Sequence, residues 1–122
     1  MIVGSTKEDL KSEKRVSLTP ETAKNIIALG LQVFIEKDYA KHLGIEDNEY
    51  LKAGVEIKAS ANEVLNSSKT IIKVNCPSEN EISSLKESTI LIGMFNPSKN
   101  KNQISKIIEK KVKIFSLELL PR

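Results

Sequence analysis

The chain has 122 residues, of which 39% are hydrophobic and 29% charged, a mixture typical of one soluble domain with its own core. Lysines interleaved with acids give a net charge of +3, and only 4% of the residues are aromatic, so the sequence lacks the basic stripe and stacking residues of a nucleic-acid-binding protein. A single cysteine, Cys76, excludes an internal disulfide, and we interpret it as a small buried or loop residue in a reducing compartment. No apolar run approaches the roughly 20 residues that cross a bilayer, and the start lacks the apolar core of a signal peptide.

Short β-branched runs alternate with capped helical segments in the first half of the chain. Strands are expected at residues 2–5, 31–36 and 55–57. A helix begins with Thr19 as N-cap and Pro20 at its first position, and it ends at Gly30. A shorter helix is expected over residues 47–53, closed by Gly54.

The same alternation continues in the second half. Ser60 with Glu63 and Ser78 with Glu81 have the spacing of a capping box, which predicts two further helix starts. Residues 70–74 and 89–93 are short and nearly continuously apolar, which indicates strands covered on both faces. A helix over residues 102–110 and a strand over residues 112–117 complete the pattern.

Strands and helices that alternate at this spacing predict a three-layer α/β fold. We expect a mainly parallel sheet, Rossmann-like or flavodoxin-like, with helices on both faces, one hydrophobic core, and the strands at residues 70–74 and 89–93 near its centre. Ligands of such sheets bind at the carboxyl ends of the strands, which here lead into residues 6–18, 75–77, 94–99 and 119–122. These segments contain no glycine-rich phosphate loop, no cluster of metal ligands and no histidine beside a nucleophile, so residue chemistry alone names no reaction.

Three stretches carry a resemblance to one protein family. Residues 13–20 are similar to an N-E-x-R-V-x-x-T-P stretch, with Ser12 where asparagine is usual, and residues 53–57 are similar to A-G-A-E-I. Residues 71–77, followed by Glu81 and Ile82, are similar to an I-L-K-V-N-x-P…E-I segment. The chain thus resembles, over nearly its whole length, the N-terminal domain of the alanine dehydrogenase and nicotinamide nucleotide transhydrogenase family, and the last segment favours the transhydrogenase alpha subunit.

Two features separate the branches of this family. The dehydrogenases carry a catalytic histidine just after the strand at residues 89–93, where this chain has Phe95, Asn96 and Pro97. Hydride transfer between two nicotinamide rings needs no proton donor, so a transhydrogenase is expected to lack this histidine. The only histidine of the sequence, His42, is interpreted as a surface residue of an earlier loop. The last residues resemble the transhydrogenase P-R-I-S-R-A-Q segment, which implies that Arg122 contacts the nicotinamide end of NAD.

Arg15 and Lys73 correspond to residues that hold the substrate carboxylate in the dehydrogenase branch. A guanidinium and an ammonium on one sheet edge suit a small carboxylic acid. A transhydrogenase binds no such acid. In that branch the alternative role of Arg15 and Lys73 is to form an ion pair at the sheet edge or hydrogen bonds that fix a loop. Both roles stay open at this point.

The resemblance implies the N-terminal part of the NAD(H)-binding component of a proton-translocating NAD(P) transhydrogenase. Its partners would be the remainder of the alpha subunit and a membrane-embedded, NADP-binding subunit, which would keep the chain cytoplasmic and peripheral to the inner membrane. We expect a single domain, residues 1–122, truncated at its C-terminal end, without the second, NAD-binding Rossmann domain, inactive alone and binding NAD weakly or not at all. The alternatives are a fragment of an alanine or saccharopine dehydrogenase-type oxidoreductase and a non-catalytic remnant module.

Overall fold

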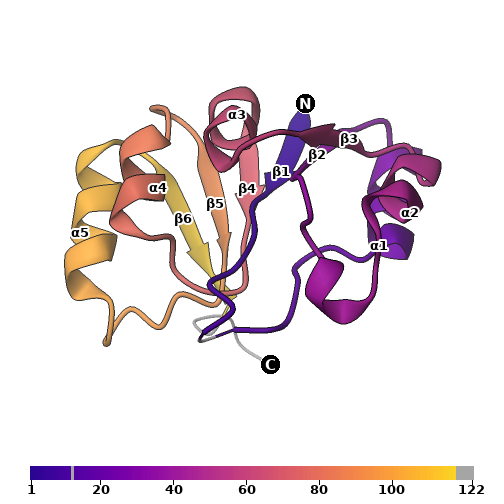
Figure 1. The fold of residues 1–122 in the computed structure, drawn as a ribbon. Helices are drawn as coiled ribbons and strands as arrows, with labels where there is room; N and C mark the ends of the chain where they lie inside the picture. The colour runs from indigo at the N-terminus through magenta and orange to yellow at the C-terminus, as the bar shows by residue number, and fades with distance from the viewer. Residues whose placement is uncertain (12, 118–122) are drawn as a thin grey trace.

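In the part of the chain that the structure describes, six parallel strands form one sheet in the order β3-β2-β1-β4-β5-β6 (Figure 1). The computed structural model describes residues 1–11 and 13–117. The strands are β1 (Ile2–Ser5), β2 (Gln32–Glu36), β3 (Glu56–Lys58), β4 (Thr70–Ile72), β5 (Ile90–Gly93) and β6 (Lys113–Ser116). The chain starts in the middle of the sheet, proceeds outward to β3, returns across β1, and proceeds outward again to β6. This Rossmann-like order confirms the predicted fold class and the interior positions of β4 and β5.

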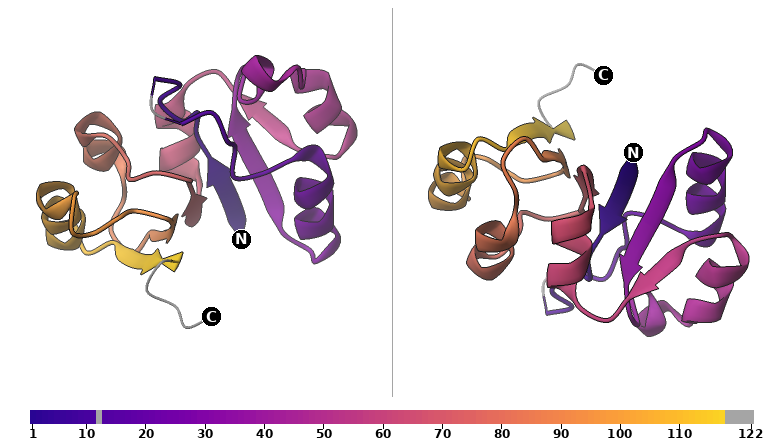
Figure 2. Two further views of the ribbon diagram at one scale, coloured as in Figure 1. Left: turned by 90° about the horizontal axis from the view of Figure 1, so that it is seen from below. Right: turned by 90° about the horizontal axis from the view of Figure 1, so that it is seen from above.

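Helices cover both faces of the sheet, as expected from right-handed crossovers (Figures 1 and 2). The helical elements are α1 (Pro20–Ala28), the 3₁₀ helix η1 (Lys41–Leu43), α2 (Asp47–Lys52), α3 (Ala61–Ser67), α4 (Glu79–Ser84) and α5 (Lys101–Glu109). Helices α1 and α2 pack on one face, and α3, α4 and α5 pack side by side on the other. Among the helices of residues 1–11 and 13–117, none is long and apolar enough to span a bilayer.

The predicted helix starts are present, with one difference. The Thr19 hydroxyl accepts a hydrogen bond from the Thr22 N–H at the start of α1. At α4 both bonds of the capping box between Ser78 and Glu81 form. At α3 Ser60 caps the Glu63 N–H, but the Glu63 carboxylate accepts from Ala59, one residue before the expected partner, so only half of that box exists.

The sheet divides the single core that the sequence predicts into two clusters. The cluster on the α1 side contains Leu18, Ala23, Val33, Ile35, Tyr39, Ala40, Tyr50 and Val55. The cluster on the α3–α5 side contains Leu65, Ile71, Ile82, Leu85, Leu91, Phe95, Ile107 and Val112. Because strand residues alternate between faces, Ile35 belongs to the first cluster while Ile71 and Leu91 belong to the second.

The two faces of the sheet are not covered equally, and here the expectation that the strand at residues 89–93 is covered on both faces is wrong. On the face opposite Leu91, Ile90 lies beside Lys113 and Ile92 lies beside Phe115. These isoleucines are only partly buried and belong to neither cluster, and Phe115 is exposed. The crossovers that carry α1 and α2 run from β1 outward to β3, so these helices lie over that half of the sheet, and no helix of the described residues covers β5 and β6 on this face.

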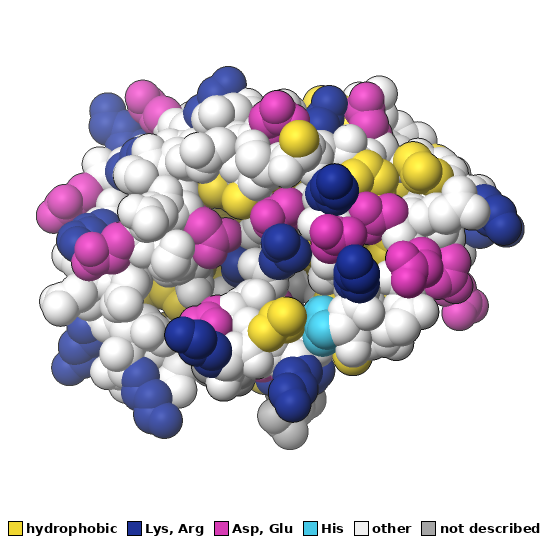
Figure 3. Space-filling model, viewed as in Figure 1, with side chains coloured by type: hydrophobic (Ala, Val, Ile, Leu, Met, Phe, Trp, Pro, Cys, Tyr) yellow, Lys and Arg dark blue, Asp and Glu magenta, His cyan; other side chains and the backbone are white. Residues whose placement is uncertain are grey.

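Charged side chains of both signs are interspersed on the face of the molecule shown in Figure 3. Ion pairs of the molecule include Lys7 with Glu36 and Lys106 with Glu79. On the face shown, this mixture agrees with the absence of a basic stripe in the sequence.

Candidate functional site at the carboxyl edge of the sheet

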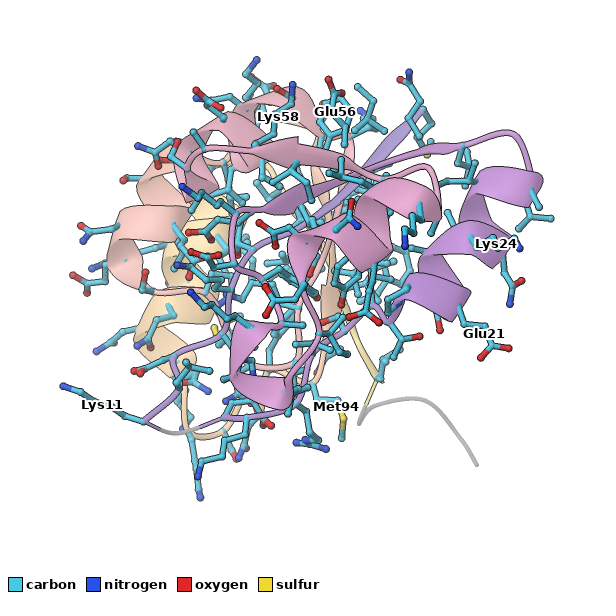
Figure 4. All side chains as sticks on the ribbon, turned by 45° about the vertical axis from the view of Figure 1, so that its right-hand side comes forward. Lys11, Glu21, Lys24, Glu56, Lys58 and Met94 are labelled. Carbon is cyan, nitrogen blue, oxygen red and sulfur yellow. The ribbon has the colours of Figure 1, made fainter. Side chains whose placement is uncertain are left out.

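The carboxyl ends of the parallel strands lie together at one edge, and the loop that connects β1 to α1, residues 6–19, crosses this edge (Figure 1). A cavity of about 240 Å³ lies between this loop and the ends of β4 and β5. It is lined by Arg15, Val16, Ser17, Ile72, Lys73, Val74, Gly93, Met94 and Leu117. Met94 marks this edge in Figure 4. The structure thus brings Arg15 and Lys73, 58 positions apart in the sequence, to one cavity.

Lys73 follows β4 directly, and its side chain is buried among acceptors of the protein itself. Its residue is 4% exposed. The ammonium donates to the Thr6 hydroxyl at 3.2 Å, to the Lys7 carbonyl at 3.1 Å and to the Glu81 carboxylate at 3.1 Å. An ammonium has three hydrogens, so every donor of Lys73 has an internal partner.

Two carboxylates complete this buried cluster. Glu81 also accepts a hydrogen bond of 2.7 Å from the Thr6 hydroxyl. Glu8 lies 3.9 Å from the Lys73 ammonium and accepts from the backbone N–H groups of Val74 and Asn75. Burial raises the pKa of Glu8, while the Lys73 ammonium and the two N–H donors oppose that rise. The cluster therefore ties the start of the loop to the end of β4 and to α4.

Arg15 lies at the mouth of the cavity in a two-bond contact with a neighbouring carboxylate. Its Nε and Nη2 donate to the two Glu13 oxygens at 2.8 and 2.9 Å, and its backbone N–H donates to the same group. These hydrogen bonds lower the pKa of Glu13 to about 2. The guanidinium side chain is 68% exposed, so Arg15 is accessible from solvent although one edge of its guanidinium is already paired.

Tyr39 fixes the far end of the loop. Its hydroxyl accepts hydrogen bonds from the Ser17 and Leu18 N–H groups at 3.1 and 3.2 Å, and it lies 2.7 Å from the Ser5 hydroxyl. Tyr50 donates to the Leu18 carbonyl from the same cluster. Burial raises the pKa of Tyr39. Within the described residues, the buried hydroxyl oxygen of Ser17 has no hydrogen-bond partner, and Ser17 lines the cavity.

Two other candidate groups show no sign of a reactive site. Cys76 is half-buried, and burial raises the pKa of its thiol to about 11, so it is protonated at neutral pH. His42 is exposed, with Nε2 2.7 Å from the Lys14 carbonyl oxygen. Residues 1–11 and 13–117 contain no group of three or more His, Cys, Asp or Glu arranged to hold a metal ion. Arg122 lies outside the described residues.

Sequence reasoning did not assign Glu8 or Tyr39 to this site, and it identified Glu81 only as a helix-capping residue. Glu81 has a visible signal as the third residue of a capping box, but its contact with Lys73 depends on where α4 begins beside β4. Glu8 and Tyr39 carry no local signal, because their partners are 66 and 34 positions away in the sequence.

Comparison with known proteins agrees with the resemblance seen in the sequence. Residues 4–122 match the family described as "Alanine dehydrogenase/PNT, N-terminal domain". The NAD(P) transhydrogenase subunit alpha of Haemophilus influenzae is 34% identical over 122 residues, which cover 100% of this chain and 23% of that protein. The alanine dehydrogenase of Methanococcus maripaludis is 34% identical over 112 residues, which cover 92% of this chain and 30% of that protein.

The crystal structure of a transhydrogenase from Sinorhizobium meliloti superposes with a TM-score of 0.93 at 32% identity, covering 100% of this chain and 36% of that chain. The chain thus spans about a quarter to a third of the length of these proteins. With the match over nearly all of its residues and the same fold in a solved relative, the chain belongs to the alanine dehydrogenase/PNT N-terminal domain family.

Proposed function

We propose that the chain is the N-terminal part of the NAD(H)-binding component of a transhydrogenase that passes hydride between NADH and NADP⁺ and couples this transfer to proton movement. The observation that carries the proposal is the environment of Lys73. A dehydrogenase of this family requires a cation that can hold the carboxylate of a small substrate, whereas all three hydrogens of this ammonium are bonded inside the protein. In this proposal Lys73 is a loop-fixing residue.

The residues after β5 support the same choice. Phe95 is fully buried and belongs to the cluster on the α3–α5 side, so the position offers no group for acid/base chemistry. Oxidation of an amino acid requires proton transfer at the substrate nitrogen or oxygen, whereas hydride transfer between two nicotinamide rings does not. A buried aromatic residue is therefore compatible with transhydrogenation.

The cavity at the carboxyl edge fits one end of NAD. Its 240 Å³ is below the roughly 300–1,000 Å³ of sites that enclose drug-sized ligands, so it suits a single ring with its substituent. Val16, Ile72 and Leu117 supply apolar walls that exclude water, and the Ser17 hydroxyl supplies an unused polar group. When bound, the nicotinamide supplies the hydride. The remaining dinucleotide contacts would come from other parts of the enzyme.

The partners and location follow the same proposal. The relative from Haemophilus influenzae is named a subunit alpha, so it works with other subunits. We place this chain with the remainder of an alpha subunit and with a membrane-embedded, NADP-binding subunit, on the cytoplasmic side of the inner membrane.

A chimaera tests the reaction. The chain would replace the matched residues of the Haemophilus influenzae subunit alpha, which would be assembled with its partner subunits and assayed for hydride transfer from NADH to an NADP⁺ analogue. The same preparation would be assayed for NADH oxidation with pyruvate and ammonium, because the family also contains alanine dehydrogenases. We expect turnover in the first assay alone. Turnover in the second would overturn the proposal in favour of the dehydrogenase.

Substitutions of two arginines distinguish the two branches further. In the chimaera, Arg122→Ala should slow hydride transfer about tenfold or more, equivalent to about 1.4 kcal/mol, if Arg122 orients the nicotinamide. Arg15→Ala should have a smaller effect, because a transhydrogenase has no substrate carboxylate for Arg15 to bind. The reverse order of effects would contradict the assignment and support the dehydrogenase branch.

A further inference from the structure

Ser17 carries a buried hydroxyl group that the folded chain leaves without a hydrogen-bond partner. Its backbone N–H donates to the Tyr39 hydroxyl at 3.1 Å, which fixes the main chain of the loop at this point. Its side-chain oxygen is buried and has no partner among the residues that the structure describes. The buried Ser68 hydroxyl, by contrast, donates to the Val64 carbonyl at 2.7 Å. A buried polar group without a partner destabilises a fold, so the Ser17 hydroxyl requires an explanation.

Ser17 lies in the wall of the cavity at the carboxyl edge, and its hydroxyl differs from the other polar groups there. The lining residues that have polar side chains are Arg15, Ser17 and Lys73. The Lys73 ammonium uses all three of its hydrogens inside the protein. Arg15 pairs one edge of its guanidinium with the Glu13 carboxylate. The Ser17 hydroxyl is therefore the uncharged polar group in this wall, and its hydrogen-bonding capacity is unused.

Apolar walls with one hydroxyl suit a planar ring that carries a single uncharged polar substituent. A hydroxyl can donate one hydrogen bond and accept others, and a carboxamide offers both an N–H donor and a carbonyl acceptor. No hydrogen bond within the described residues holds the Ser17 hydroxyl, so rotation about χ1 from one staggered position to another breaks none. A carboxylate suits the cavity less well, because a desolvated anion needs a cation with free donors, and those of Lys73 are occupied.

We propose that Ser17 is a specificity-determining residue of the nucleotide site, and that its hydroxyl turns into the cavity and hydrogen-bonds the carboxamide of the nicotinamide ring. The inference rests on the proposed function, which places this ring in the cavity, and it adds the residue that selects the substituent of the ring. It also explains the unpartnered hydroxyl, which costs stability in the ligand-free domain and gains a hydrogen bond when the ring binds. One net hydrogen bond corresponds to about a fivefold change in affinity.

NMR titrations of the isolated chain test this contact. Backbone amide signals of the wild type and of Ser17→Ala would be followed during addition of nicotinamide and of 3-methylpyridine, which has the same ring without a polar substituent. We expect nicotinamide to shift the signals of the cavity lining, and Ser17→Ala to weaken its binding about fivefold. Both proteins should bind 3-methylpyridine with affinities that agree within twofold. Nicotinate, which has a carboxylate in place of the carboxamide, should bind the wild type more weakly than nicotinamide does.

Ser68→Ala is the matched control. Ser68 precedes β4, whereas the cavity lies at the other end of that strand, and its hydroxyl is bonded to the Val64 carbonyl. This variant should lower the midpoint of chemical denaturation and leave the affinity for nicotinamide unchanged within twofold. Ser17→Ala should do the reverse, because it removes no hydrogen bond of the folded chain and takes away the partner of the carboxamide. Its denaturation midpoint should stay the same or rise.

An equal loss of affinity for nicotinamide and 3-methylpyridine in Ser17→Ala, or no loss for either, would overturn the inference. Tighter binding of nicotinate than of nicotinamide to the wild type would assign the cavity to a carboxylate and would overturn it as well, whether or not Ser17→Ala folds. Hydride transfer by the chimaera without a preference for the carboxamide in the isolated chain would refute the role of Ser17 alone. A preference for the carboxamide without hydride transfer would support the Ser17 contact and refute the proposed reaction.

Discussion

Lys73 is a buried cation whose partners come from two separate segments of the chain, the loop after β1 and helix α4. Lys73→Met keeps the volume of the side chain but leaves the Glu8 and Glu81 carboxylates without their cation. Breaking a buried ion pair in this way costs about 3 kcal/mol, since the remaining charge stays desolvated. We expect a loss of this size in the free energy of unfolding, measured by chemical denaturation.

Lys106→Met is the control for this change. Lys106 forms a shorter ion pair, 2.6 Å to Glu79, but both side chains are about half exposed or more. Water screens such pairs, so the denaturation midpoint should hardly move. Similar losses for both variants would show that Lys73 is not held by its internal partners.

The Arg15–Glu13 contact should make the stability of the fold depend on pH. The folded-state pKa of Glu13 is lowered to about 2 by Arg15, against an ordinary value of 4.5. A lowered pKa stabilises the fold above the unfolded value, and this contribution disappears as the pH falls from about 4.5 to 2. Arg15→Gln should therefore return the carboxyl pKa of Glu13 toward its ordinary range in an NMR titration. A pKa that stays near 2 would mean that backbone donors hold the carboxylate.

At the scale of an element, β5 ends at a glycine because two neighbours leave no room for a side chain. A Cβ on Gly93 would lie 2.2 Å from the Lys73 carbonyl oxygen and 2.4 Å from the Phe95 ring. Gly93→Ala must displace backbone or a buried aromatic ring, and overpacking of this kind costs about 3 kcal/mol. Gly30→Ala is the control, because a Cβ at Gly30 would meet no atom within 4 Å. This substitution should cost only about 1 kcal/mol, for placing alanine at a positive φ of 94°. Thermal denaturation that ranks the two variants in the opposite order would contradict this explanation.

The elements were predictable from sequence because their signals are local. Thr19 with Pro20 and Ser78 with Glu81 mark helix starts through bonds to residues three positions away, and the apolar runs mark β4 and β5. The candidate site was predictable only in part. Arg15 and Lys73 could be placed at one edge by topology, but the partners of Lys73 could not be identified, because contacts over 66 positions depend on packing that no local pattern records.

At the scale of the whole molecule, the two halves of the sheet differ in how many of their faces are covered by helices. The half with β1, β2 and β3 has α1 and α2 over one face, together with a cluster built around Tyr39 and Tyr50. In the part of the chain that the structure describes, helices cover the half with β5 and β6 on the α3–α5 side alone. The cavity with Arg15 and Lys73 opens at the carboxyl edge where these halves meet.

The isolated chain should bind NAD weakly and catalyse no reaction of nicotinamide nucleotides. Its sequence contains no glycine-rich phosphate loop, and its carboxyl-edge cavity of about 240 Å³ accommodates one ring of the dinucleotide. Micromolar affinity corresponds to about 8 kcal/mol, which is too much for the few polar groups around Arg15 and Ser17. Isothermal titration calorimetry should give a dissociation constant well above micromolar, and absorbance at the NADH band should not change in the presence of NADP⁺. A micromolar constant would mean that this domain alone makes the main NAD contacts. The proposal that other parts of the complete enzyme supply most of these contacts would then be wrong.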